Sequence, residues 1–257
     1  MTRTAAVVAA LVALAVLPAR AAAVPIAPDP GLVAIGGVQE ARDHARSRAG
    51  TTAFAVARPG GRIRGTLINH WFYSASVVKA MLALAVVREA RHRDLTPTER
   101  ALLRPMITVS DNDAASAVYR RVGGAGLYRV AAAAHMTHFR DVGNWADAHI
   151  TAADQARLFL RIDKLAPKRH RAYLRGLLGG IVSYQRWGIA PAAAARDFHI
   201  MFKGGWRTNI SHQVALLERD GQRIALAVLT SGASDGYGRL TETGVAERVL
   251  ASRPPRR

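Results

Sequence analysis

The stretch Ser74-Ala-Ser-Val-Val-Lys-Ala-Met-Leu82 opens an apolar run that continues to Glu89. Apolar residues occupy nearly every position of this run, which is typical of a helix surrounded by a hydrophobic core. Ser76 and Lys79 are three positions apart, so on a helix their side chains share one face, with Cβ atoms about 5–6 Å apart. A serine hydroxyl becomes a nucleophile when a base takes its proton, and burial makes the neutral amine of lysine accessible. The stretch therefore predicts a nucleophile and its base at the start of a buried helix.

A second motif, Ser110-Asp111-Asn112, follows an apolar stretch and directly precedes a predicted helix. Its serine can pass a proton between Lys79 and a leaving nitrogen, and its asparagine can hydrogen-bond a substrate amide. By itself the motif also fits an ordinary helix cap.

A third motif, Lys203-Gly204-Gly205, ends a predicted strand. Lys203 can supply a second cation beside Lys79, and the two glycines allow a ligand to approach the backbone closely. The backbone N–H groups of Ser76 and Trp206 could then converge as an oxyanion hole. A surface lysine before a glycine turn is the alternative interpretation.

The scarcity of lysine favours a common role for the three motifs. Only four of the 36 cationic residues are lysines, and two of these four fall inside the motifs. Each motif is weak alone, but together they predict one catalytic site.

The longer strings 74–82 and 106–115, followed by Gly123-Gly124, resemble the class A β-lactamases and penicillin-recognising serine hydrolases. The resemblance covers about residues 38–251. It implies that Ser76 is the acylated nucleophile and that Lys79 and Ser110 transfer protons. It also implies a set of substrate contacts, namely Asn112, Lys203, Gly205 and Trp206.

The sequence departs from the family pattern at Gly204, where the family usually has a hydroxyl that helps to hold the substrate carboxylate. Arg207 or Thr208 could replace this contact, or could simply be turn residues facing solvent.

A second departure concerns the loop between Gly123 and Thr151. Class A enzymes carry a Glu-x-x-Leu-Asn pattern there, and its glutamate activates the water that releases the acyl group. No glutamate lies between Arg100 and Arg207, and the acids of this loop are Asp141 and Asp147. Asp147 is therefore the candidate water-positioning residue, with a loop brace or cap as its alternative role.

The order of the predicted elements indicates an α/β (α+β) fold. A helix over 38–48 and a hairpin of 52–57 with 62–67 come first, and the chain ends with strands over 199–202, 212–219 and 223–231 and a helix over 240–251. A block of helices lies between these two parts. One helix is predicted to start at the capping box Thr96-Pro-Thr-Glu99. The others are predicted over 75–89, 113–122, 125–135, 151–162 and 166–178. We expect an antiparallel sheet flanked by terminal helices (residues 24–73 plus 190–257), with an inserted all-helical domain (residues 74–189).

The first 23 residues have the pattern of a secretory signal peptide. Arg3 precedes an apolar run over 5–17, and small residues follow, which predicts cleavage after Ala21 or Ala23. The alternative is a membrane anchor, for which the run is short. A secreted or cell-envelope location is expected.

The formal net charge of +18 suggests anionic cell-wall polymers as neighbours. The arginines are scattered and no nucleic-acid motif accompanies them, so nucleic acid is not an expected partner. The chain has no cysteine, and His135 and His138 lack a further ligand with zinc spacing. We expect a monomer with no cofactor and no metal.

These features together predict an exported serine hydrolase that attacks an amide of a β-lactam or related peptide substrate through an acyl-enzyme at Ser76. One alternative is a D-Ala-D-Ala peptidase or another amide or ester hydrolase acting on wall material. The other is a non-catalytic or slow-turnover protein that binds β-lactams or peptidoglycan, which the missing loop glutamate favours.

Overall fold

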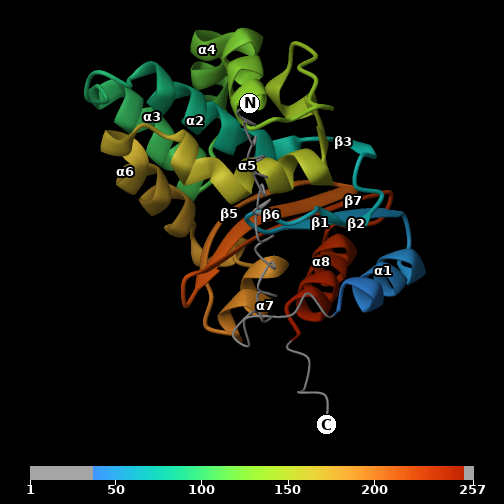
Figure 1. Cartoon of the computed structure of the whole chain (residues 1–257). Coiled ribbons are helices and arrows are strands. Elements are labelled where there is room, and N and C mark those ends of the chain that lie inside the picture. The colour runs from blue at the N-terminus through green and yellow to red at the C-terminus, as the bar shows by residue number, and fades with distance from the viewer. Residues whose placement is uncertain (1–36, 252–257) are drawn as a thin grey trace, which may run out of the picture. The chain divides into compact units, whose positions relative to one another are not determined.

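Two antiparallel sheets organise residues 37–251, which are the part of the chain that the computed structural model describes (Figure 1). The larger sheet has the order β2-β1-β7-β6-β5, and β3 pairs with β4 in a smaller one. The strands are β1 (Thr51–Ala57), β2 (Arg64–Thr66), β3 (Trp71–Tyr73), β4 (His149–Thr151), β5 (His199–Arg207), β6 (Ile210–Arg219) and β7 (Gln222–Ser231). The predicted signal peptide and its cleavage positions lie outside the described residues.

Helices cover both faces of the larger sheet. They are α1 (Val38–Ser47), α2 (Lys79–Glu89), α3 (Pro97–Thr108), α4 (Asn112–Ala133), α5 (Ala152–Leu165), α6 (Lys168–Gly179), α7 (Ile189–Ala194) and α8 (Asp235–Val249), with 3₁₀ turns η1 (Ala75–Val78), η2 (Trp145–Asp147) and η3 (Ser183–Gln185). In Figure 1, α1, α7 and α8 lie on one face and α2 to α6 on the other, with α5 against the sheet. The predicted fold class is confirmed, while the exact domain boundaries stay a prediction. Within residues 37–251, no helix is both long and apolar enough to span a bilayer.

Local sequence signals explain where several helices begin. Thr96 caps α3 as predicted: its hydroxyl accepts the N–H of Glu99 at 3.1 Å, and the Glu99 carboxylate accepts the N–H of Thr96 at 2.7 Å. Thr151 caps α5 by accepting the N–H of Asp154 at 3.2 Å. These contacts satisfy N–H groups that have no partner within the helix.

Glycine interrupts α4 at the position where the sequence predicts a break between two helices. Gly123 has φ 59° and ψ −178°, a conformation that few other residues adopt. Three elements were not predicted, namely β3, β4 and α7. Each of the two strands is only three residues long, which is too short for a periodic pattern to reveal it.

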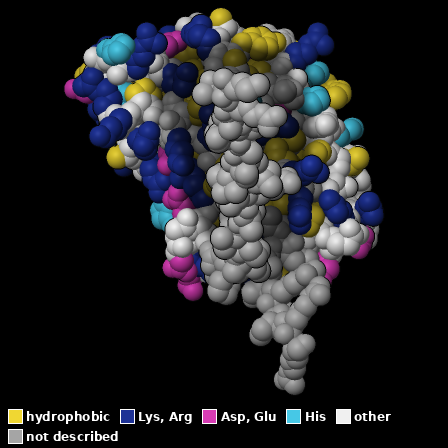
Figure 2. All heavy atoms as spheres, in the orientation of Figure 1, with side chains coloured by type: hydrophobic (Ala, Val, Ile, Leu, Met, Phe, Trp, Pro, Cys, Tyr) yellow, Lys and Arg dark blue, Asp and Glu magenta, His cyan; other side chains and the backbone are white. Residues whose placement is uncertain are grey.

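Arginine ion pairs tie the helical layer to the sheet. Asp163 of α5 accepts a hydrogen bond from Arg175 of α6 at 2.9 Å and pairs with Arg223 of β7. Glu218 of β6 pairs with the same two arginines at 2.6 and 2.7 Å. Burial alone would raise the pKa of Asp163, but the hydrogen bonds from Arg223 and Arg175 lower it. Figure 2 shows that Lys and Arg side chains are spread widely over the visible face and exceed Asp and Glu in number.

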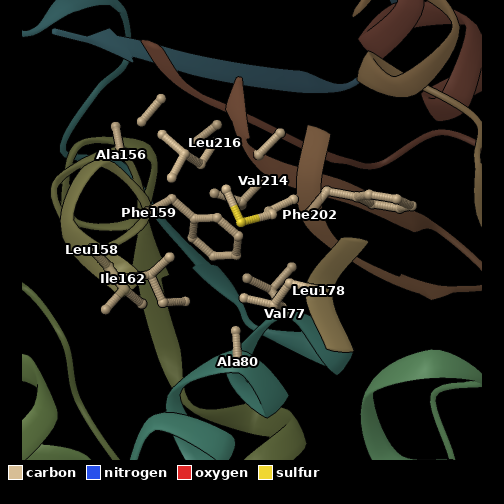
Figure 3. Close-up of a cluster of buried hydrophobic side chains, with 14 of the residues drawn as sticks. Val77, Ala80, Ala156, Leu158, Phe159, Ile162, Leu178, Phe202, Val214 and Leu216 are labelled. Carbon is tan, nitrogen blue, oxygen red and sulfur yellow. The ribbon is translucent and has the colours of Figure 1, made fainter. Parts of the chain in front are cut away.

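A hydrophobic cluster fills the space between the helical layer and the sheet (Figure 3). Phe159 of α5 and Phe202 of β5 are completely buried and meet Val77 of η1 and Ala80 of α2 in this cluster. Burying one such side chain stabilises a fold by roughly 1.5–3 kcal/mol. The cluster therefore fixes η1, which carries Ser76, against β5, which carries Lys203.

Candidate active site

Ser76 lies in a tight 3₁₀ turn that leads into the buried helix α2. Ala75 before it has φ 43°, a left-handed conformation that is strained for a residue with a side chain. The structure places Ser76 half-buried, whereas Lys79 is fully buried. Among the described residues, the Ser76 hydroxyl makes no hydrogen bond. The strained turn thus presents an unpaired hydroxyl at the beginning of α2.

The Ser110 hydroxyl lies between the two lysines that the sequence singles out. Lys79 Nζ lies 3.2 Å from it and Lys203 Nζ lies 3.0 Å from it. Lys79 also donates to the Ser110 carbonyl at 2.6 Å and to Asn112 Oδ1 at 2.7 Å. Ser110 has φ 63°, so the chain adopts a left-handed conformation to bring its side chain here. The three motifs therefore meet at one hydroxyl.

Burial lowers the pKa of both lysine amines, Lys79 and Lys203. It lowers the pKa of Lys79 to about 8, and the nearby charge of Asp111 opposes this shift in part. Complete burial, reinforced by the positive charge of Lys79, lowers the pKa of Lys203 well below its ordinary value. Two ammonium groups that share one hydroxyl also repel each other, so a neutral amine is accessible here near neutral pH.

Strand β5 runs directly against the turn that carries Ser76. A Cβ atom added at Gly205 would lie 2.7 Å from the backbone nitrogen of Ser76 and 2.9 Å from that of Val77, so only glycine allows this approach. Trp206 follows Gly205 on the same strand. The predicted oxyanion-hole donors are thus on adjacent segments.

The ring of Trp187 explains why position 204 of the third motif is a glycine. A Cβ atom at Gly204 would lie 3.1 Å from two atoms of the Trp187 ring. The indole ring also packs edge-to-face on Trp206, with centroids 6.0 Å apart. The space for a larger side chain at position 204 is therefore occupied by an aromatic ring.

The loop before β4 covers the lysine side of the site. The Lys79 ammonium lies 4.8 Å from the centroid of the Trp145 ring, a cation–π contact. Asp147 accepts hydrogen bonds on both carboxylate oxygens, from Arg207 at 2.6 Å and from Asn144 at 2.7 Å. Arg207 also donates to the carbonyl of Ala146 at 2.7 Å. Asp147 therefore links this loop to β5 through Arg207. A role for Asp147 in positioning water stays a prediction.

Two supporting residues of the site could not be identified from the sequence. His212, the first residue of the predicted strand 212–219, is fully buried in β6, and its Nε2 lies 2.9 Å from the carbonyl of Tyr73, three positions before Ser76. Burial lowers its pKa to about 4, so the ring is neutral and Nε2–H donates to this carbonyl. Trp145 was also missed, although a tryptophan inside a short loop is a signal that could have drawn attention. No cluster of metal-ligating side chains occurs within the described residues.

A family model for the beta-lactamase enzyme family matches residues 96–250, more than half of the chain. The chain belongs to the beta-lactamase enzyme family. The match includes Ser110, Asn112 and Lys203. The predicted family resemblance is therefore confirmed. A comparison with curated proteins gives no match.

Solved structures show the same beta-lactamase fold. The β-lactamase from Sphaerobacter thermophilus is 19% identical, with a TM-score of 0.70 over 83% of this chain and 95% of that chain. The structure of PBP-A is 18% identical, with a TM-score of 0.71 over 83% and 94%. An ancestral class A β-lactamase is 19% identical, with a TM-score of 0.68 over 83% and 98%. At these identities the likeness concerns the fold, which is that of the β-lactamase-like serine hydrolases.

Proposed function

We propose that this protein is an exported serine hydrolase that opens an amide of a β-lactam, or of a related peptide, through an acyl-enzyme at Ser76. The observation that carries the proposal is the Ser110 hydroxyl, which contacts both Lys79 and Lys203 at 3.2 and 3.0 Å beside the turn of Ser76. Lys79 Nζ hydrogen-bonds Ser110 and Asn112 and not Ser76. We assign it as the base because burial lowers its pKa and because it follows Ser76 by three positions at the start of α2.

The proposed reaction begins with proton transfer from Ser76 Oγ to the neutral amine of Lys79. Oγ then attacks the carbonyl carbon, and the negative oxygen receives hydrogen bonds from the N–H groups of Ser76 and Trp206. As the carbon–nitrogen bond breaks, the proton passes from Lys79 through Ser110 to the leaving nitrogen. Water hydrolyses the resulting ester and regenerates Ser76.

Substrate binding is assigned to the same β5 edge. Lys203 is assigned to the substrate carboxylate, whose negative charge would favour the protonated amine. Asn112 offers its amide, and Gly205 keeps β5 close to the turn of Ser76, so that a substrate on this edge can reach the nucleophile. Arg207 is engaged by Asp147 and Ala146. Lys203, which contacts Ser110 and the Gly204 carbonyl, is the residue that we assign to the carboxylate.

A persistent acyl-enzyme is the second candidate outcome, and the loop before β4 favours it. Both oxygens of Asp147 are engaged, by Arg207 and Asn144, and the loop lacks glutamate. A protein that acylates quickly but releases the product slowly would act as a β-lactam sensor or binding protein. One structural neighbour, an L158E mutant of PBP-A, is an acyl-enzyme complex with penicillin G.

Mass spectrometry after mixing with benzylpenicillin tests the proposal. We expect a covalent adduct on the parent protein, none on Ser76→Ala, and an unchanged adduct on Ser183→Ala, which alters an exposed serine. A transient adduct indicates hydrolysis and a persistent one a sensor. Absence of any adduct from β-lactams and from D-Ala-D-Ala peptides would refute the proposed chemistry.

Export is tested separately from chemistry. N-terminal sequencing of protein recovered from the medium or cell envelope should give a first residue of Ala22 or Val24. Retention of Met1 on a membrane-bound protein would indicate an anchor instead.

A further inference from the structure

Two aromatic side chains are exposed on the strand that leads to the nucleophile. Trp71 and Tyr73 of β3 are 48% and 41% exposed, whereas Phe72 between them is buried. Alternation along the strand places the two exposed rings on one face. Tyr128 and Tyr184 are exposed as well, but Trp71 and Tyr73 lie together on one short strand.

The exposed rings are held in fixed orientations. Trp71 stacks on His149 of β4, with ring centroids 4.1 Å apart and planes 17° apart. Tyr73 meets Trp71 edge-to-face at 5.4 Å. The register of β3 and β4 pairs Tyr73 and Trp71 with His149 and Thr151, which brings the three rings together. Preorganised rings of this kind lose little entropy when a ligand binds.

A pocket of about 450 Å³ lies against these rings, and we call it the aromatic pocket. Strand β3, the turn between β5 and β6, and the end of β7 form its walls. Its lining residues are His70, Trp71, Phe72, Tyr73, Arg207, Asn209, Ile210, Ser231 and Gly232. Its volume falls in the range of pockets that bind small ligands.

Polar atoms at the aromatic pocket lack partners. Among residues 37–251, neither the indole N–H of Trp71, nor the hydroxyl of Tyr73 as a donor, nor the side-chain amide of Asn209 makes a hydrogen bond within the protein. The Arg207 guanidinium, which is paired with Asp147, lies 5.8 Å from the Tyr73 ring centroid. The pocket thus combines flat apolar ring faces with unused donors and acceptors.

We propose that the aromatic pocket binds a pyranose ring of a carbohydrate that carries hydroxyl and acetamido groups. The C–H face of a sugar ring covers an aromatic ring, while its polar substituents pair with the groups at the rim. A purely apolar ligand would leave those groups unpaired, which is costly for any that become buried. A pyranose ring presents a C–H face and a rim of polar groups in one small unit, which a short polar peptide does not. A sugar satisfies both requirements.

The aromatic pocket and the candidate active site share a residue. Arg207 lines the pocket and also holds Asp147 of the loop, and it follows Gly205 by two positions, about 7 Å along the strand. If Ser76 acts as proposed, a sugar in the pocket could belong to the same molecule as the amide. This extension rests on the proposed function, whereas binding of the sugar itself does not.

Calorimetric titration of the purified protein with tri-N-acetylchitotriose tests the proposal. We expect binding in the micromolar to millimolar range, at least tenfold weaker binding by Trp71→Ala, and partial recovery in Trp71→Phe. Asn209→Ala alters an exposed turn residue and should weaken binding without changing the melting transition. Tyr184→Ala, at another exposed tyrosine, is the matched control and should bind like the parent.

Cellotriose and phenylacetamide separate the possible ligands. Cellotriose lacks acetamido groups and should bind more weakly than chitotriose. Absence of chitotriose binding, or equal binding by the parent, Trp71→Ala and Asn209→Ala, would overturn the proposal. So would phenylacetamide binding that depends on Trp71 when chitotriose binding does not. Ser76→Ala should bind chitotriose as the parent protein does. Sugar binding can therefore be confirmed or refuted even if no acyl adduct forms at Ser76.

Discussion

At the scale of single residues, the geometry around Ser110 accounts for the chemistry that the site can perform. Its hydroxyl contacts one lysine from α2 and one from β5. Complete burial of both lysines lowers their pKa values. Neither lysine forms an ion pair with a carboxylate among the described residues, so no such pair offsets the effect of burial on their pKa values.

Replacement of Lys79 tests its role as the base. In Lys79→Met we expect acylation by benzylpenicillin to fall by at least 10³-fold, because the amine assigned as the base for Ser76 is removed. The melting transition should change little, since relief of a buried charge offsets lost hydrogen bonds to Ser110 and Asn112. Lys168→Met, at an exposed lysine, is the control. Acylation at the parent rate would assign the base elsewhere.

The pKa of Lys79 also sets a pH dependence. Only the neutral amine accepts a proton, so a pKa of about 8 makes acylation rise with pH and level off above pH 8. An ordinary lysine would leave the rate rising to about pH 10. Stopped-flow acylation between pH 6 and 10 measures the midpoint. A rate that falls as pH rises from 6 to 8 would exclude a lysine base.

At the scale of elements, the loop before β4 links the lysine site to β5. Asp147→Asn removes the ion pair with Arg207 at 2.6 Å. Because both oxygens of Asp147 are already engaged, we expect deacylation to change by less than about twofold, a small effect for a half-exposed pair. Decay of the penicillin adduct measures the rate, with Asp220→Asn in an exposed hairpin as the control. A tenfold slower decay would instead assign Asp147 to water positioning.

Gly204 of strand β5 packs against the Trp187 ring, so we expect the effects of substitutions at these two positions on stability to be coupled. Gly204→Thr should destabilise the fold by about 1–3 kcal/mol through overpacking against the ring. The same change in a Trp187→Ala background should cost less, since the ring no longer occupies the space. Urea denaturation of the four proteins of this double-mutant cycle gives the coupling energy. Additive effects would show that Trp187 does not dictate glycine at this position.

At the scale of the whole molecule, the cluster between helices and sheet determines whether the site assembles. Phe159→Ala removes a fully buried ring, so we expect a loss of about 3–5 kcal/mol in unfolding free energy. Tyr128→Ala, at a half-exposed ring, should cost much less. Denaturant unfolding compares the two variants. Equal losses would contradict the central place of Phe159 in the core.

The elements that the sequence predicted differ from those it missed mainly in length. Long elements with strong signals were predicted well, as the capped α3 and the break at Gly123 show. The short strands β3 and β4 escaped prediction because each is defined by pairing with a segment more than 70 positions away. The roles of Trp145 and Trp187 also escaped prediction, since their contacts with Lys79 and Gly204 join different elements of the fold and follow no local spacing.

Residue type and local spacing were enough to predict the family, the fold class and the three motifs, because they specify helix caps and strand patterns. The folded structure was needed to show that Lys79 and Lys203 share the Ser110 hydroxyl, that both oxygens of Asp147 are engaged, and that aromatic rings line a pocket that includes Arg207. These features depend on burial and on distances between segments far apart in the chain, which no local pattern encodes.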